Sequence, residues 1–336
     1  MRGIRYRATV EFIRLPRFRR ASTAAPLCLT ERDRAIIRQV RHHRFLRSWQ
    51  IIALVGGSPQ QMLRRLQLLY HHGYLERPRR QLEYFHRGGS RHMVYGLGNK
   101  SSTVLKGYMP DADTFRFNEK NTAVGRIFLD HALLVSDVMV AIELACRKTD
   151  HVRLIYGEDL PLPQKLQAQS QPFRWKVKIN GKRLSVVPDR VFALEFNDGN
   201  GNTDRAYFFL EADRGTMPVV RRNLSQTSFR RKLLAYEATW NQDIHRRRFD
   251  FNRFRVLTVT SSTKRVESLV RACSELKSGH GLFLFADQSI LSGDILSATW
   301  QTGRPGESAR LVERFQGHEK KGAGDCCTEI SPAPLA

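Results

Sequence analysis

Four side chains in the central part of the chain have types and spacing that could support metal-dependent phosphate chemistry. An apolar run, LSVVPDRVFALEF, holds Asp189 in its middle and is expected to form one strand, and a second run, AYFFLEADRGT, carries Glu211 and Asp213 near its end. Residues two apart in a strand lie on the same face, so Glu211 and Asp213 should point the same way. Three carboxylates that converge at strand ends would offer Mg²⁺ the oxygen ligands that it prefers. Lys232, in the following helix SFRRKLLAYEATW, would then stabilise charge at this site.

The same acidic residues are also compatible with a purely structural role. An aspartate after a proline can cap or turn a strand, and Glu211 could pair with Arg214, Arg230 or Arg231. His131, in an upstream helical segment, is by itself more typical of a packed histidine than of a metal ligand. Mg²⁺ is the only cofactor indicated, and only if these residues catalyse cleavage.

Helical and strand patterns around these residues predict an α/β domain, of mixed α+β type, over residues 123–290. A long amphipathic helix over residues 123–148 comes first. The Asn-Gly pair at 180–181 predicts a hairpin turn between two strands. The expected strands lie at 152–156, at 175–179, through Asp189, up to Glu211, at FRVLTVTSS and at GLFLFAD, with helices around Lys232 and at 263–276. The polar residues 301–336 are expected to form a disordered tail.

The distribution of charge indicates a polyanionic partner for the N-terminal third. The chain of 336 residues has a formal net charge of +24, and residues 1–100 contain 21 Lys and Arg against 5 Asp and Glu, a net of +16. Nucleic acid is the commonest partner of so basic a segment. A merely solubilising arginine-rich surface is the simpler alternative. An anionic membrane fits less well, because no basic amphipathic helix with a large apolar face is present.

Residues 29–100 have the features of a winged helix-turn-helix domain. Thr30 with Asp33 starts a first helix, a second and shorter helix ends at the Gly-Gly pair 56–57, and Ser58 with Gln61 forms a capping box that starts a third. Two β-like runs around RGGS follow and would form the wing. In such a domain the third helix enters the major groove of double-stranded DNA.

The residues expected to contact DNA fall into two groups. Side chains of the third helix would read base edges, and those of the wing would meet phosphates. They are Gln60, Gln61, Arg64 and Arg65 in the first group and Arg77, Arg79, Arg80, Arg87 and Arg91 in the second. Residues 1–28 are expected to be a basic arm and linker, and residues 101–122 a connector. A winged helix used for protein contacts is the alternative.

The cysteines and the lengths of the apolar runs indicate the cellular compartment that is expected for the protein. The five cysteines lack metal-ligand spacing and form no disulfide framework, which favours a reducing compartment. No apolar run is long enough to cross a membrane, and no signal-type segment follows the basic N-terminus. A cytoplasmic protein is expected, and a homodimer is possible.

The order of acidic strands and basic helix resembles the restriction-endonuclease-like fold, an αβββαβ arrangement found in nucleases. The signature of that fold is Pro-Asp followed, one strand later, by Asp/Glu-x-Lys; here Pro188, Asp189 and Glu211 match, and Asp213 stands at the lysine position. Lys232 could supply that charge from the next helix. The resemblance implies acids that hold Mg²⁺ and a lysine that positions or deprotonates the attacking water. A domain that keeps the fold and binds nucleic acid without cleaving it is the alternative.

Several segments in the same order resemble the replication-relaxation family of bacterial proteins, associated with plasmids and mobile elements. These segments are LTERDRAIIRQVRHHRFL, HALLVSD, VVPDR, FFLEADRGT, KLLAY and VLTVTSS. The resemblance spans about residues 29–290 and implies a role in plasmid replication or in relaxing DNA, with replication or relaxase proteins as possible partners. The expected function is DNA binding in that setting. The alternatives are an active Mg²⁺-dependent endonuclease and a transcriptional regulator without catalysis.

Overall fold

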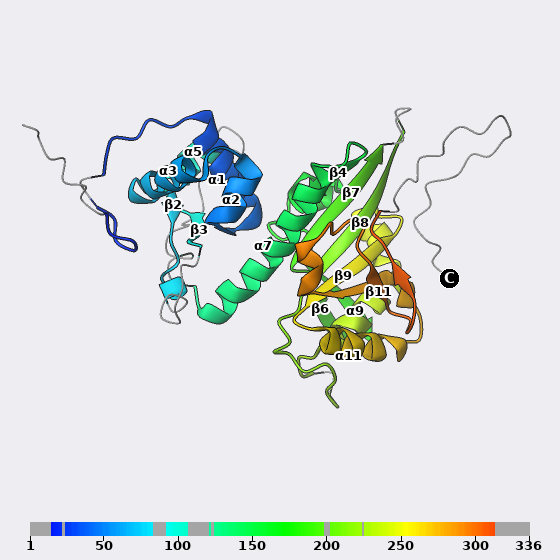
Figure 1. Cartoon of the computed structure of the whole chain (residues 1–336). Coiled ribbons are helices and arrows are strands. Elements are labelled where there is room, and N and C mark those ends of the chain that lie inside the picture. Colours follow the sequence, from blue (N-terminus) through cyan, green and yellow to red (C-terminus); the bar gives the residue numbers. More distant parts are fainter. Residues whose placement is uncertain are drawn as a thin grey trace, which may run out of the picture. The chain divides into compact units, whose positions relative to one another are not determined.

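The chain folds as a mixed α/β protein, as predicted, and divides into two compact units (Figure 1). The structure is a computed structural model that describes residues 15–21, 24–82, 92–106, 121, 124–197, 202–223 and 225–312. The first unit spans Met1–Leu129 and the second Asp130–Ala336. Within the described residues no helix is both long and apolar enough to cross a membrane.

The first unit packs helices against a small antiparallel sheet. Its elements are α1 (Glu31–His43), β1 (Phe45–Arg47), α2 (Ser48–Val55), α3 (Pro59–His71), β2 (Leu75–Glu76), a 3-10 turn (Arg79–Gln81), β3 (Val94–Leu97) and α5 (Ser101–Leu105). β3 lies between β1 and β2 in the sheet. The predicted succession of three helices and two strands is present, with the additional strand β1 between α1 and α2.

Local hydrogen bonds explain where α1 begins. The side chain of Thr30 accepts from the backbone of Asp33, whose carboxylate accepts from the backbone of Thr30, so the predicted start of α1 is a capping box. Ser58 precedes α3, which begins at Pro59 as expected, but the Ser58 side chain makes no capping hydrogen bond. The predicted capping box with Gln61 is therefore wrong, and Pro59 fits because the first position of a helix needs no N–H donor.

Two segments expected outside the first unit's core contact it instead. In the predicted N-terminal arm, the guanidinium of Arg20 forms an ion pair with Glu76 at 2.8 Å and donates to the carbonyl of Tyr70. In the predicted connector, Val104 and Leu105 of α5 are buried. Residues 1–14 of the arm and residues 107–120 of the connector lie outside the described residues.

The second unit is built on a seven-stranded mixed sheet (Figure 1). Its elements are α7 (Arg126–Cys146, whose first turn belongs to the first unit), β4 (Val152–Tyr156), α8 (Gln164–Gln167), β5 (Trp175–Ile179), β6 (Lys182–Val186), β7 (Arg190–Asn197), β8 (Thr203–Ala212), α9 (Phe229–Asn241), α10 (Ile244–Phe249), β9 (Phe254–Thr260), α11 (Thr263–Ser274), β10 (Phe283–Asp287), β11 (Trp300–Thr302) and β12 (Ser308–Ala309). The sheet order is β12-β11-β10-β9-β8-β7-β4, parallel from β8 through β10 and antiparallel elsewhere.

The central elements α7, β4, β7, β8, α9 and β9 occur in the expected αβββαβ order. Strand residues alternate between the two faces of the sheet, so each face has its own core. Phe209 and Val256 pack with α9, α11 and the β5–β6 hairpin, whereas Phe192 and Leu210 pack with α7 and a C-terminal segment. The helices thereby hold the ends of β7 and β8 from both sides.

The predicted continuous strand through Asp189 is wrong. The run divides into β6, which pairs with β5 in a separate two-stranded sheet, and β7, which belongs to the large sheet. Pro188 lies in the break, where its missing N–H removes a ladder hydrogen bond. Asp189 consequently sits immediately before β7, at an end of the sheet and not within a strand.

The predicted disorder of residues 301–336 is also wrong for the part that the structure describes. β11 and β12 extend the large sheet beyond β10, and Trp300 is fully buried. Burial of this tryptophan and backbone pairing outweigh the polar composition that suggested a tail. Residues 313–336 lie outside the described residues.

Candidate functional site

Five ionisable side chains of the second unit form a connected cluster at an end of the large sheet. Asp189 precedes β7, Glu211 lies at the penultimate position of β8, and Lys232 and Tyr236 lie one turn apart on α9; His131 is supplied by α7. The break at Pro188 and the end of β8 bring the two acids to the same end of adjacent antiparallel strands, where Arg190 pairs with Leu210.

The carboxylate of Asp189 is fixed through both oxygens. Oδ1 lies 3.0 Å from Nε2 of His131, and Oδ2 accepts a 2.8 Å hydrogen bond from the backbone N–H of Ala212. Burial would raise the pKa of Asp189, but the His131 hydrogen bond and the charge of Lys232 outweigh it and lower that pKa. Asp189 is therefore held as an anion.

Glu211 is the more buried of the two acids in the cluster, with 2% of its surface exposed. Oε1 accepts a 2.6 Å hydrogen bond from the hydroxyl of Tyr236, and Oε2 contacts the ammonium of Lys232. Burial raises the pKa of Glu211 to about 7, the nearby charge of Asp189 adds to the rise, and Lys232 opposes it. Because this pKa is close to neutral, Glu211 can exchange a proton near pH 7.

The remaining members carry positive charge or donate protons. Burial would lower the pKa of Lys232, but the charges of Glu211 and Asp189 outweigh it and raise that pKa, so the side chain stays an ammonium. The hydrogen bond to Asp189 raises the pKa of His131. Burial and the adjacent Glu211 keep the hydroxyl of Tyr236 protonated, since they raise its pKa well above the usual value.

Asp213 is held by partners different from those of Glu211. Its carboxylate receives Nε of Arg265 at 2.8 Å and Nη2 of Arg265 at 3.3 Å, and the hydroxyl of Thr260 donates at 2.8 Å. The pair is largely buried, with 5% of the Asp213 side chain and 14% of the Arg265 side chain exposed. In the part of the chain that the structure describes, no group of three acidic, histidine or cysteine residues is arranged to hold a metal ion.

Of the three acids predicted to hold Mg²⁺, Asp189 and Glu211 lie in this cluster, whereas Asp213 is paired with Arg265. This ion commonly takes only one or two protein carboxylates and completes its shell with water and substrate phosphate. A cation beside them would also offset the charge of Asp189, which contributes to the raised pKa of Glu211. The metal role predicted for Asp189, Glu211 and Asp213 stays a prediction, and Asp213 fits it least.

The predicted DNA-contacting side chains of α3 differ in their surroundings. Gln60, Gln61 and Arg64 are exposed on its first turns, opposite the buried face of the helix. Arg65 is not part of this exposed set, because its Nε donates to Asp33 at 2.6 Å and its Nη2 also contacts that fully buried carboxylate. Its place is between α3 and α1, where it holds the two helices together.

Of the predicted wing arginines, Arg79 and Arg80 are exposed in the 3-10 turn. Arg77 is only 5% exposed; its guanidinium lies 4.2 Å from the ring centre of Tyr70 and donates to the hydroxyl of Tyr95. A buried guanidinium stacked on tyrosine does not reach phosphates, so its predicted wing role is replaced by a packing role. Arg87 and Arg91 lie outside the described residues.

Sequence reasoning missed Tyr236 and Arg265 and gave little weight to His131. Tyr236 had a usable signal, since it lies four residues after Lys232 and residues at that spacing share a helix face. Arg265 is 52 residues from Asp213, and no local pattern indicates the pair. For His131, the segment HALLVSD showed only a histidine on an apolar helix, and only the folded chain reveals its aspartate partner.

Comparison with known proteins gives one result. No curated protein and no solved structure matches the chain significantly. A family model described as Replication-relaxation matches residues 37–253, which is more than half of the chain. The match includes α3 and all five members of the cluster around Asp189 and Glu211, but not Arg265. The protein therefore belongs to the replication-relaxation family.

Proposed function

We propose that the protein binds double-stranded DNA through its first unit and acts in the replication or relaxation of plasmid or mobile-element DNA. The observation that carries the proposal is the exposed polar face of α3, within a succession of helices and strands typical of a winged helix-turn-helix domain. The family match supports the replication or relaxation setting.

The two faces of α3 support its role as a recognition helix. Met62, Leu66 and Leu69 anchor it in the core, while Gln60, Gln61 and Arg64 remain outside. Arginine binds the major-groove edge of guanine with two hydrogen bonds, and glutamine does the same for adenine. Helix α3 therefore presents side chains suited to sequence recognition.

Substitution on α3 tests base reading. Gln61→Ala with Arg64→Ala should weaken binding to the preferred sequence more than binding to unrelated duplex DNA, by about 1 to 3 kcal/mol for each lost base contact. Arg79→Ala with Arg80→Ala should instead weaken binding to all sequences and flatten its salt dependence. Fluorescence anisotropy with labelled duplexes measures both. Unchanged binding by both variants would remove the winged-helix proposal.

A Mg²⁺-dependent endonuclease is a second candidate, and one contact favours it. The nuclease signature places a lysine two residues after the second acid, where this chain has Asp213; the ammonium of Lys232 contacts Glu211 from α9 instead. This contact supports Lys232 as the charge that the signature expects. A bound Mg²⁺ would supply Lewis-acid stabilisation of phosphate charge.

In this candidate mechanism the residues of the cluster have separate tasks. Asp189 and Glu211 would hold the cation, and His131 together with the Ala212 amide orients the Asp189 carboxylate. The ammonium of Lys232, 33% of whose side chain is exposed, can reach substrate and stabilise developing negative charge. Tyr236 donates to Glu211 and fixes its orientation.

Cleavage of supercoiled plasmid separates the enzyme from a binding protein without catalysis. With Mg²⁺ or Mn²⁺, conversion to nicked or linear forms should occur and should be lost in Asp189→Asn and Lys232→Met. Glu195→Gln, in β7 and bound to Arg153 and Arg205, is the control that should retain it. No cleavage with either metal would exclude the endonuclease and leave the alternative of a DNA-binding regulator without catalysis.

A further inference from the structure

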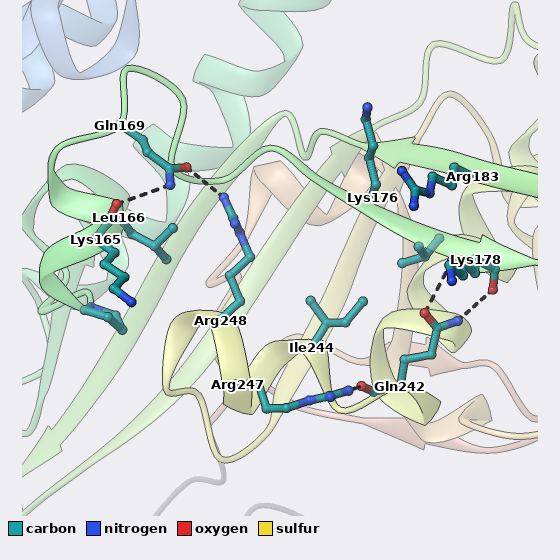
Figure 2. Close-up of a pocket in the computed structure, with 12 residues that line it drawn as sticks. Lys165, Leu166, Gln169, Lys176, Lys178, Arg183, Gln242, Ile244, Arg247 and Arg248 are labelled. Carbon is teal, nitrogen blue, oxygen red and sulfur yellow. Dashed lines mark hydrogen bonds between the residues drawn. The ribbon is translucent and has the colours of Figure 1, made fainter.

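A basic groove lies in the second unit, outside the cluster around Asp189 and Glu211 (Figure 2). It is a hollow of about 690 Å³ between α8, the β5–β6 hairpin and α10. The cationic side chains of this basic groove are Lys165, Lys176, Lys178, Arg183, Arg247 and Arg248, and its lining contains no acidic residue. The rest of the lining is uncharged and consists of Pro163, Leu166, Gln169, Val177, Gln242 and Ile244.

The arrangement of positive charge in the basic groove is unfavourable in the protein by itself. Lys178 lies directly opposite Arg183 in the hairpin, and Lys176 lies two residues away on the same face of β5. Like charges directly opposite in neighbouring strands destabilise the pair. Among the described residues, none of the six cationic side chains forms an ion pair with an acid of this chain. Their charge is therefore open to an external anion.

Hydrogen bonds hold the walls of the basic groove in place. The side chain of Gln242 donates to the carbonyl of Lys178 at 2.7 Å and accepts from its N–H at 3.3 Å, which ties the exposed edge of β5 to the end of α9. The guanidinium of Arg248 donates to Gln169 at 2.9 Å (Figure 2). It also donates to the carbonyl of Arg174 at 3.2 Å. A site whose walls are fixed before binding loses less entropy when a ligand enters.

We propose that the basic groove binds the phosphate backbone of double-stranded DNA as a second contact surface, separate from α3. This inference rests on the proposed DNA binding of the protein and extends it to the second unit. Exposed lysines act as point charges toward phosphates, so the contact is independent of base sequence. The hairpin also leads within three residues from the end of β6 to Asp189, so the same chain segment connects the groove with the candidate site.

The test is the salt dependence of DNA binding by the full chain. A groove variant carries Lys176→Gln, Lys178→Gln and Arg183→Gln. A matched control carries Lys264→Gln, Arg271→Gln and Lys277→Gln, which remove the same charge from exposed positions on and just after α11. Each phosphate contact contributes about 0.9 to the slope of log affinity against log salt concentration. Loss of three contacts should lower the slope by about 2.7 in the groove variant.

Affinity for an unrelated duplex is measured by anisotropy between about 50 and about 200 mM salt. Over that interval the wild type should lose about 40-fold more affinity than the groove variant, and the control should match the wild type. Equal slopes in the groove variant and the control would overturn the proposal. Unchanged duplex binding with loss of binding to an acidic polypeptide would also overturn it and assign the groove to a protein partner.

The α3 variant keeps the two proposals distinguishable. If Gln61→Ala with Arg64→Ala loses sequence preference while the groove variant binds as wild type, the groove proposal is refuted and the winged-helix proposal is supported. If the groove variant changes while the α3 variant and the Arg79→Ala with Arg80→Ala variant both bind as wild type, the winged-helix proposal is refuted and the groove proposal is supported. A wild-type chain that binds no duplex DNA refutes both.

Discussion

Replacement of Glu211 by glutamine should change how the stability of the protein depends on pH. Burial raises the pKa of Glu211 to about 7 from its usual 4.5, whereas in the unfolded chain the usual value returns. Between these two values the folded protein binds more protons than the unfolded protein, so wild-type stability falls as pH rises. The glutamine in the Glu211→Gln variant cannot ionise, so the variant does not lose stability in this way as the pH rises.

The size of the effect follows from the pKa difference. A pKa difference of one between the folded and unfolded states changes the free energy of unfolding by about 1.4 kcal/mol. The rise in the pKa of Glu211 from 4.5 to about 7 therefore corresponds to about 3 kcal/mol. Relative to wild type, the free energy of unfolding of Glu211→Gln should increase by about that amount between pH 4.5 and pH 7.5. Changes in packing that accompany the substitution add an offset that does not depend on pH.

Urea denaturation followed by tryptophan fluorescence measures the effect. Three of the four tryptophans, Trp175, Trp240 and Trp300, lie in the second unit, so the signal reports mainly on the unit that contains Glu211. Glu195→Gln is a matched control, because the pKa of Glu195 is shifted in the opposite direction to that of Glu211. Burial would raise the pKa of Glu195, but Arg153 and Arg205 outweigh it and lower that pKa.

The stability that Glu195 contributes is present above pH 4.5 and is lost as the pH falls through its lowered pKa. Glu195→Gln should therefore be less stable than wild type near neutral pH and approach it in acid. A stability difference for Glu211→Gln that stays constant from pH 4.5 to pH 7.5 would refute the raised pKa of Glu211. It would also remove the argument that this residue exchanges a proton near neutrality.

Three further outcomes concern buried or paired charges. Asp213→Ala leaves Arg265 without its anion and should lower the free energy of unfolding by about 3 to 5 kcal/mol, as measured by urea denaturation; a loss below 1 kcal/mol would contradict a buried pair. Arg65→Met leaves Asp33 fully buried with only Thr30 as partner and should lower the melting temperature, with less loss in the double variant Arg65→Met/Asp33→Asn; equal loss in both would argue against the pair. The raised pKa of His131 means that its contribution to stability is present below about pH 6.5 and is lost as the pH rises through the folded value. His131→Asn should therefore differ from wild type most in acid, and a difference that grows with pH would contradict the pair with its carboxylate partner.

Features set by neighbouring residues were predictable from the sequence. The capping box of Thr30 with Asp33 depends on residues three positions apart. The turn at Asn180 and Gly181 depends on two residues that accept positive φ, and both adopt it, at 48° and 76°. The acids Asp189 and Glu211 were identified from the short motifs Pro-Asp at 188–189 and Glu-Ala-Asp at 211–213. In each case the determining interactions lie within one turn or one strand.

The contacts that define the candidate site depend on the fold. His131 and Asp189 are 58 residues apart, Lys232 and Glu211 are 21 apart, and Asp213 and Arg265 are 52 apart. Helical or strand periodicity shows which face a side chain occupies, but not which distant element packs against that face. The two neighbouring acids show the consequence, since Glu211 faces Lys232 whereas Asp213 is neutralised by an arginine of α11.

The sequence by itself determined the mixed α/β class, the basic first unit and the two acids of the candidate site, because composition and local patterns carry that information. Tertiary structure decided which cations are available to a ligand. Arg65 and Arg77 are held inside the first unit, and Lys232 is brought to Glu211. Within the part of the chain that the structure describes, the cations of the basic groove form no ion pair with an acid. The physical reason is that burial and charge pairing arise between elements distant in the chain, and these two factors determine whether a charged side chain stabilises the fold or remains free to bind a ligand.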